Sequence, residues 1–281
     1  MLRTIIEVAT DNIARYITDY NAMPLDAQEV VNGVKDSVYL GFNKSPANVL
    51  MIIKDRIKSI FEVYAEKNMM TLSEIAELSH DRQLALISDN GTSDNTQLHK
   101  RRVKFSSCFS DGHALTYYSL SMGNTIGNTH YGLCYVVLKL DSVKNATALK
   151  YDSLKKYFSS SDDFLEEECF GDLLPYTHIE CLVASKFYKK GSADSIESVI
   201  EAIDAEVATN DMPLEVMTCE LVDARSILSV VMCHTTLDYY MGLEDREERG
   251  EVLSELDKKA LKIYDELLRT LRKYDIPLKV V

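Results

Sequence analysis

The chain has 281 residues, 46% of them hydrophobic and 27% charged, which is enough apolar material for a globular protein with a sizeable core. Its net charge of −13 argues against non-specific binding to duplex nucleic acid, because neutralisation of phosphates by basic side chains supplies most of that affinity. One local exception is a run of cations, Lys100, Arg101, Arg102 and Lys104. This run predicts either a basic groove or a solvated entry to a strand.

The cysteines and the lack of long apolar runs indicate where the protein resides. None of the six cysteines forms a Cys-x-x-Cys pair, and none lies near a histidine at zinc-finger spacing. We therefore expect buried free thiols in a reducing cytoplasm. Glu7 and Asp11 interrupt the first apolar residues too soon for a signal peptide, and no apolar run approaches the roughly 18 residues of a membrane helix. The sequence predicts a cytoplasmic protein that does not enter a membrane.

Residues 1–75 are predicted to form an N-terminal helical region. Apolar residues recur at three- and four-residue spacing over residues 2–17, 25–38 and 46–67, and the last of these segments begins with Ser45-Pro46, a cap followed by a proline at a helix start. Thr71 followed by Glu74 has the form of a capping box and predicts one more short helix.

The next segment, residues 76–225, is predicted to be an α/β core. Glycines gather before residue 132, and three strands are expected at residues 103–105, 133–140 and 180–187. Residues 82–88 and 114–119 are predicted to be short helices or turns. Helical spacing returns over residues 196–207, and the alternating residues 214–222 suit a late strand.

The C-terminal residues 226–281 are predicted to be helices packed on this core. Residues 225–241 look helical, and residues 251–274 carry apolar side chains along one face with charged side chains opposite. Such a stripe either packs on the protein's own core or binds a partner or a second copy.

Several motifs of common enzymes are missing from the chain. It contains no phosphate-binding Gly-x-x-x-x-Gly-Lys-Ser/Thr, no Gly-x-Gly-x-x-Gly, no Gly-x-Ser-x-Gly and no His-Glu-x-x-His. Nucleoside-triphosphate hydrolysis by a P-loop, Rossmann-type redox chemistry and zinc proteolysis are therefore disfavoured. A carboxylate-dependent nuclease lacks a convincing metal cluster.

A series of short motifs in the middle block resembles the ADP-ribosyltransferase superfamily, in particular its distant bacterial and phage members. The matching residues, in chain order, are His80, Phe105-Ser106-Ser107, Ala114 with Tyr117 or Tyr118, Tyr135-Val136-Val137, and a glutamate among Glu166, Glu167 and Glu168. The resemblance implies an α+β fold with a central split antiparallel β-sheet core and helical flanks at both ends. It implies an enzyme that uses NAD as a substrate to modify a protein or nucleic acid, as a toxin or phage-defence effector with a possible neutralising partner protein.

The resemblance also implies roles for these residues. Glu168, Glu166 or Glu167 would stabilise the oxocarbenium-like transition state of glycosidic cleavage, and a stacked Tyr117 or Tyr118 would clamp the nicotinamide ring. His80 would hold a ribose or phosphate, with Arg101 or Arg102 as the alternative, and Ser106 and Ser107 would join the strands of the cleft. His130-Tyr131 after the Asn-rich loop would position a nucleotide, or else cap the following strand.

Each of these features has a structural alternative. The glutamate run is also typical of a solvated helix end or strand edge. Tyr117 and Tyr118 could instead be one core residue and one surface residue. The chain as a whole could be a non-catalytic interaction or inhibitor protein that acts through its helical flanks. The transferase hypothesis requires the glutamate, a tyrosine and His80 or Arg102 to converge on one cleft between two small antiparallel sheets.

Overall fold

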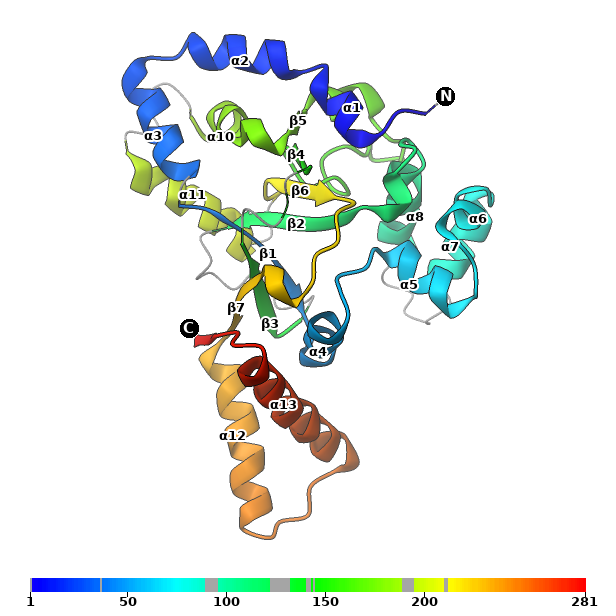
Figure 1. Cartoon of the computed structure of the whole chain (residues 1–281), viewed down its shortest axis with the longest axis vertical. Coiled ribbons are helices and arrows are strands. Elements are labelled where there is room, and N and C mark those ends of the chain that lie inside the picture. The colour runs from blue at the N-terminus through cyan, green and yellow to red at the C-terminus, as the bar shows by residue number, and fades with distance from the viewer. Residues whose placement is uncertain are drawn as a thin grey trace.

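The computed structural model describes residues 2–35, 37–88, 96–121, 132–139, 143, 145–188, 195–209 and 212–281. It is a mixed α/β protein built on one open sheet (Figure 1). The described strands are β1 (Tyr39–Lys44), β2 (Thr116–Ser121), β3 (Cys134–Leu138), β4 (Thr147–Leu149), β5 (Leu173–Pro175), β6 (Glu215–Thr218), β7 (Ile227–Met232) and β8 (Leu278–Val280).

Helices surround this sheet. They are α1 (Ile5–Thr10), α2 (Ile13–Asn21), α3 (Leu25–Lys35), α4 (Pro46–Lys54), α5 (Ile60–Lys67), α6 (Leu72–Ala76), α7 (His80–Ser88), α8 (Thr96–Ser106), α9 (Glu166–Gly171), α10 (Ile179–Phe187), α11 (Ile196–Thr209), α12 (His234–Glu248) and α13 (Glu255–Lys273). Short 3-10 turns are η2 (Gly112–Ala114), η5 (Tyr176–His178) and η6 (Ala224–Ser226).

The strands lie in the order β5-β4-β6-β2-β1-β3-β7-β8, and all neighbours are antiparallel except β7 and β8. The sheet therefore draws strands from the whole chain. β1 comes from the region predicted to be helical, and it lies in the middle of the sheet. β7 and β8 come from the C-terminal residues, for which only helices were predicted.

The sheet forks between β1 and β2. The two strands pair at one end only, where Tyr39–Gly41 lie opposite Ser119–Ser121. Beyond Gly41, β1 continues alongside β3, with Phe42 opposite Val136 and Lys44 opposite Cys134. β2 leaves in the other direction and pairs with β6 from Thr116 to Ser119. Pairing between β1 and β2 nevertheless keeps all the described strands in one sheet.

Each face of the sheet carries its own core. The larger core packs α2, α3, α4, α10, α11 and α13 against side chains such as Leu40, Val136, Val216 and Val230. The second core packs α1, α8 and α9 against Leu149 and Met217 at the β4–β6 end. In Figure 1, α12 and α13 form a hairpin that projects from the sheet, and α5, α6 and α7 gather beside α8.

Strongly periodic segments formed the predicted elements. The helices expected at residues 196–207 and 251–274 are α11 and α13, and the strand at residues 133–140 is β3. Thr71 and Glu74 form the predicted capping box of α6. The apolar stripe of α13 packs largely on the protein itself, since Tyr264, Leu267 and Leu271 are buried.

Several short elements were predicted wrongly. Residues 103–105 belong to helix α8 and not to a strand, residues 114–119 lead into strand β2 and not a helix, and residues 180–187 form helix α10 and not a strand. Residues 46–67 form two helices, α4 and α5, because the chain leaves the helix at Asp55. In α10 the consecutive residues 181–184 are all buried, so no polar face marks the helical period.

The structure also bears on two broader expectations, the state of the cysteines and the absence of a membrane helix. All six cysteines are free thiols, and Cys134, Cys169 and Cys181 are buried. Among the described residues, no helix combines the length and the apolar character needed to cross a membrane.

Candidate functional site: a pocket at the fork of the sheet

The fork between β1 and β2 opens into a pocket of about 470 Å³. This volume falls in the range of roughly 300–1,000 Å³ that is typical of small-molecule sites. Phe42, Asn43 and Lys44 of β1 line one border, and Thr116–Ser119 of β2 line the other. The pocket lies where β1 and β2 separate after Gly41, since β1 continues along β3 and β2 along β6.

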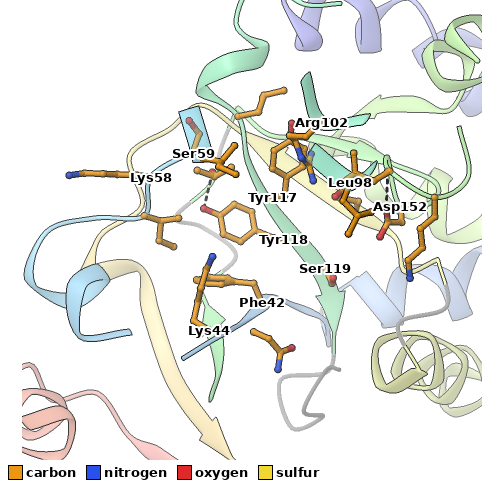
Figure 2. Close-up of a pocket in the computed structure, with 18 of the residues that line it drawn as sticks. Phe42, Lys44, Lys58, Ser59, Leu98, Arg102, Tyr117, Tyr118, Ser119 and Asp152 are labelled. Atoms are coloured by element: carbon orange, nitrogen blue, oxygen red, sulfur yellow. Dashed lines mark hydrogen bonds between the residues drawn. The ribbon is translucent and has the colours of Figure 1, made fainter. Parts of the chain in front are cut away.

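One side of the pocket is aromatic. Figure 2 shows Phe42, Lys44 and Tyr118 on this side. The rings of Phe42 and Tyr118 meet edge to face with centroids 5.5 Å apart, and the Tyr118 hydroxyl donates to Thr116 Oγ1 at 2.9 Å. Burial lowers the pKa of Lys44, whose ammonium group lies 5.8 Å from the Phe42 ring centroid. This side offers ring surfaces with one poorly solvated cation.

The opposite side contains a buried guanidinium group. Cζ of Arg102 lies 3.4 Å from the centroid of the Tyr117 ring, and Nη1 of Arg102 is buried without a hydrogen-bond partner among the described residues. Burial would lower the pKa of Arg102, but Tyr117 and Glu215 outweigh it and the pKa is raised. A buried donor that lacks a partner is rare in folded proteins, and it marks a position where a ligand acceptor can bind.

Helix α8 is fixed so that Arg102 points inward. Its neighbour Arg101 points to the loop after β4, where Nη2 donates to Asp162 Oδ1 at 2.6 Å and Nη1 donates to the Leu154 carbonyl at 2.7 Å. Lys104 donates to the Asp162 carbonyl at 2.6 Å. The basic run predicted from sequence is thus divided, with Arg101 and Lys104 holding the loop and Arg102 in the pocket.

A second ionisable group, Glu215 of β6, is buried at the same end. The backbone N–H of Ser153 donates to its Oε2 at 3.0 Å. Burial and the negative charge of Asp152 raise the pKa of Glu215 to about 7, while Arg102 acts in the opposite direction. Glu215 can therefore gain or lose a proton near neutral pH, as a general acid or base must.

The pocket has charges of both signs. Arg102, Lys44 and Lys155 supply cations, and Asp152 and Glu215 supply carboxyl groups. His99 also lines the pocket, and burial lowers its pKa, with a further contribution from Arg102. The site can bind anionic groups through its cations and hydroxyl groups through its carboxylates.

The structure brings together three of the residues predicted from sequence. Arg102, Tyr117 and Tyr118 all line the pocket. Ser106 is buried behind Tyr117, where it lowers the pKa of that phenol against the larger effect of burial. These residues lie at the end of helix α8 and on strand β2, the reverse of the element types predicted for them.

The other predicted residues lie elsewhere. His80 and Ser107 line a second cavity of about 290 Å³ beside His113. Glu166, Glu167 and Glu168 are exposed in the first turn of α9 and line neither of these two cavities. His130 and Tyr131 fall outside the described residues. The glutamates therefore do not converge with Arg102 and the tyrosines.

Sequence reasoning missed several contributors, among them Phe42, Lys44, Asp152 and Glu215. Only Glu215 left a usable signal: it is a single acidic residue at the start of a strand in which all four side chains are buried. The strand was predicted, and an acid on its buried positions needs a polar partner. Phe42 and Lys44 were missed because residues 39–44 were left as a connection between two predicted helices, at 25–38 and 46–67, and not predicted as a strand.

No protein-family model and no curated protein sequence matches this chain. Within the described part of the chain, no group of three or more histidine, cysteine, aspartate or glutamate side chains is arranged to hold a metal ion.

Proposed function

We propose that the pocket at the sheet fork binds a small anionic ligand that carries a flat ring, a description that fits a nucleotide and includes NAD. The observation that carries the proposal is the buried Arg102 guanidinium, stacked on Tyr117 with Nη1 unpaired. A buried cation of this kind is stabilised when a phosphate or carboxylate accepts the N–H groups of Nη1.

The remainder of the pocket suits the other parts of a nucleotide. Phe42 and Tyr118 offer ring surface against which a base can pack. Asp152 and Glu215 offer carboxylate oxygens to ribose hydroxyl groups. The cavity of about 470 Å³ is large enough for a mononucleotide or for part of NAD.

ADP-ribosyl transfer from NAD is the second candidate, and one observation favours it. An ionisable glutamate, Glu215, shares the pocket with Arg102 and Tyr117. In this hypothesis Glu215, and not Glu166, Glu167 or Glu168, stabilises the positive charge that develops as the bond to nicotinamide breaks. A protein or nucleic acid would then accept the ADP-ribose. The alternative, an interaction protein without catalytic activity, requires no ligand in this pocket.

Calorimetric titration with AMP, ADP, NAD and inorganic phosphate tests the binding proposal. We expect Arg102→Met to weaken nucleotide binding by about tenfold or more, because a charge-assisted hydrogen bond is lost. Arg102→Lys should recover part of the affinity. Lys100→Met removes the same charge from an exposed position of α8 and should have no effect. If no nucleotide binds to the wild-type protein, the proposal is wrong and the interaction hypothesis gains.

Release of nicotinamide from NAD tests the transferase hypothesis separately. We expect Glu215→Gln to lower the rate by about a hundredfold or more, as for the loss of one electrostatic stabiliser. Glu168→Gln is the matched control and should keep the wild-type rate. Activity that depends on Glu168 but not on Glu215 would overturn this assignment.

A further inference from the structure

A cluster of cations surrounds one tyrosine beside the pocket. The ammonium groups of Lys186, Lys156 and Lys150 lie 4.7, 5.7 and 5.8 Å from the centroid of the Tyr151 ring. The ring is half-buried, so part of it remains accessible. We call Lys150, Tyr151, Lys156 and Lys186 the Tyr151 cluster.

The charges of this cluster are only partly balanced. Lys186 is buried and forms an ion pair with Glu206 at 2.7 Å, so it holds the ring in place and adds no net charge. Lys150 donates to Ser185 Oγ at 2.7 Å, and neither it nor Lys156 forms an ion pair with a described residue. The nearby Asp172 accepts hydrogen bonds from the hydroxyls of Tyr16 and Tyr157.

Arg15 adds a further cation to this region. Burial lowers the pKa of Lys150. The negative charge of Asp172 raises this pKa and the positive charge of Arg15 lowers it, so Asp172 and Arg15 both act on Lys150. The guanidinium group of Arg15 donates to the carbonyl of Gly171. The region thus keeps an excess of positive charge on a protein whose net charge is −13.

The Tyr151 cluster and the pocket draw residues from the same loop and the same helix. Asp152, Leu154 and Lys155 line the pocket, and Tyr151 and Lys156 are their immediate neighbours in the chain. On α11, Val207 lines the pocket, while the adjacent Glu206 holds Lys186 under Tyr151. One loop and one helix therefore connect the two sites.

We infer that the pocket accepts the terminal nucleotide of a single-stranded nucleic acid, whose next nucleotides lie along the Tyr151 cluster. This inference rests on the proposed nucleotide site. A base stacks on the exposed part of the Tyr151 ring, and Lys150 and Lys156 bind the adjoining phosphates. Stacking on an aromatic ring with flanking cations is how single strands are bound without base pairing. A duplex would bring many more phosphates against an acidic surface.

Fluorescence anisotropy with end-labelled oligonucleotides tests this inference. We expect a tetranucleotide to bind about tenfold or more tightly than the mononucleotide, as stacking of one base contributes. RNA and DNA tetranucleotides form separate arms, which identify the sugar that is preferred. The double variant Lys150→Gln/Lys156→Gln should remove this advantage, and Tyr151→Leu should reduce it. The affinity for the mononucleotide should stay at the wild-type value in both.

The salt dependence of binding provides a second measurement. Loss of two phosphate contacts should lower the slope of log affinity against log salt concentration by about 1.4, at about 0.7 for each contact. The double variant Lys259→Gln/Lys262→Gln carries the same change of charge on exposed positions of α13 and serves as the control.

The outcomes separate this inference from the proposed function. Equal affinity for mononucleotide and tetranucleotide would overturn the inference and leave the pocket proposal intact. Tetranucleotide binding that Arg102→Met does not weaken would overturn the path from the pocket to Tyr151. A polyglutamate peptide that binds as well as the tetranucleotide would overturn the assignment to nucleic acid. Failure of every nucleotide to bind would overturn both proposals.

Discussion

The guanidinium group of Arg102 lies over the ring of Tyr117, with 3.4 Å between Cζ and the ring centroid. Arg102 comes from helix α8 and Tyr117 from strand β2, so the contact joins a helix to the edge of the sheet fork. A desolvated cation over an aromatic face contributes up to about 2 kcal/mol. The contact therefore both fixes α8 on the sheet and presents Arg102 to the pocket.

Removal of the Tyr117 ring should destabilise the protein far more than removal of its hydroxyl. We expect Tyr117→Leu to lower the free energy of unfolding by about 2–4 kcal/mol, because it removes the cation–π contact and leaves a void. Tyr117→Phe should cost about 1 kcal/mol or less, since the ring stays over Arg102 and only the hydroxyl beside Ser106 is removed. Urea unfolding of both variants measures the difference. Equal losses would show that the hydroxyl, and not the ring, matters.

Glu215 should make stability depend on pH near neutrality. Its pKa in the folded protein is raised to about 7, above the ordinary value of 4.5, so folding favours the protonated form. The stabilisation is complete below the ordinary value and is lost as the pH rises through about 7. From about pH 5 to about pH 8, the wild type should lose on the order of 3 kcal/mol relative to Glu215→Gln.

Urea unfolding at several pH values measures this difference between Glu215→Gln and the wild type. Glu220→Gln changes a glutamate of the same region outside the pocket and should follow the wild-type curve. Parallel curves for the wild type and Glu215→Gln would contradict the prediction, because the carboxyl group would then titrate alike in both states.

Gly41 permits the packing at which β1 and β2 separate. A Cβ atom at this position would lie 2.4 Å from atoms of the Tyr135 ring. We expect Gly41→Ala to destabilise the protein by about 1–3 kcal/mol through overpacking, and the smaller side chain of Tyr135→Leu to restore part of the loss in the double variant. Gly242→Ala in α12, where the structure has nothing within 4 Å of the new Cβ, should instead stabilise by about 0.5–1 kcal/mol. Thermal unfolding of the wild type, the three single variants and the double variant tests both predictions.

The ion pair between Asp162 and Arg101 of α8 should stabilise the folded protein at neutral pH and be lost in acid. Hydrogen bonds from Arg101 and Gln97 hold the pKa of Asp162 below its ordinary value of 3.8. The stabilisation is therefore present above pH 3.8 and is lost as the pH falls through the lower pKa of the folded state. Asp162→Asn should lower the melting temperature at neutral pH, and its curve should meet that of the wild type in acid. Asparagine tolerates the positive φ of 63° at this position, so the change isolates the charge.

Asp163→Asn is the matched control for this experiment. Asp163 is exposed and accepts a hydrogen bond from Ser161 Oγ at 2.6 Å, and it forms no ion pair with a described residue. Its substitution should leave the melting temperature nearly unchanged. A similar fall in both variants would mean that general loss of acidic charge, and not the Arg101 contact, is responsible.

The sequence by itself determined the elements that have a strong period or a cap. The amphipathic pattern of residues 251–274 predicted α13, the spacing of residues 196–207 predicted α11, and Thr71 with Glu74 predicted the start of α6. These signals are local: a helix face or a cap is complete within a few turns of chain, so neighbouring residues suffice to define it.

Short apolar segments were decided by tertiary structure. Residues 180–187 have the composition of a buried strand, yet α10 packs between α2, α3 and the sheet, which buries several of its faces. Residues 116–121 pair with β1 and β6, whose residues lie about 80 and about 100 positions away in the chain. Periodicity over six residues cannot distinguish these outcomes, because burial on all sides removes the polar face that marks the period.

The residues of the candidate site also fall into those that the sequence indicated and those that only the tertiary structure brought to the pocket. Arg102, Tyr117 and Tyr118 were named from the sequence through the resemblance of short motifs around them to the ADP-ribosyltransferases. Glu215, Asp152 and Lys44 could not be grouped with them, since nothing local indicates that residues 44, 102, 152 and 215 meet. What joins them is the fork between β1 and β2, which follows from strand pairing over long sequence separations. Composition and local pattern thus supplied the chemical groups, and only the pairing of distant strands decided which of them share a pocket.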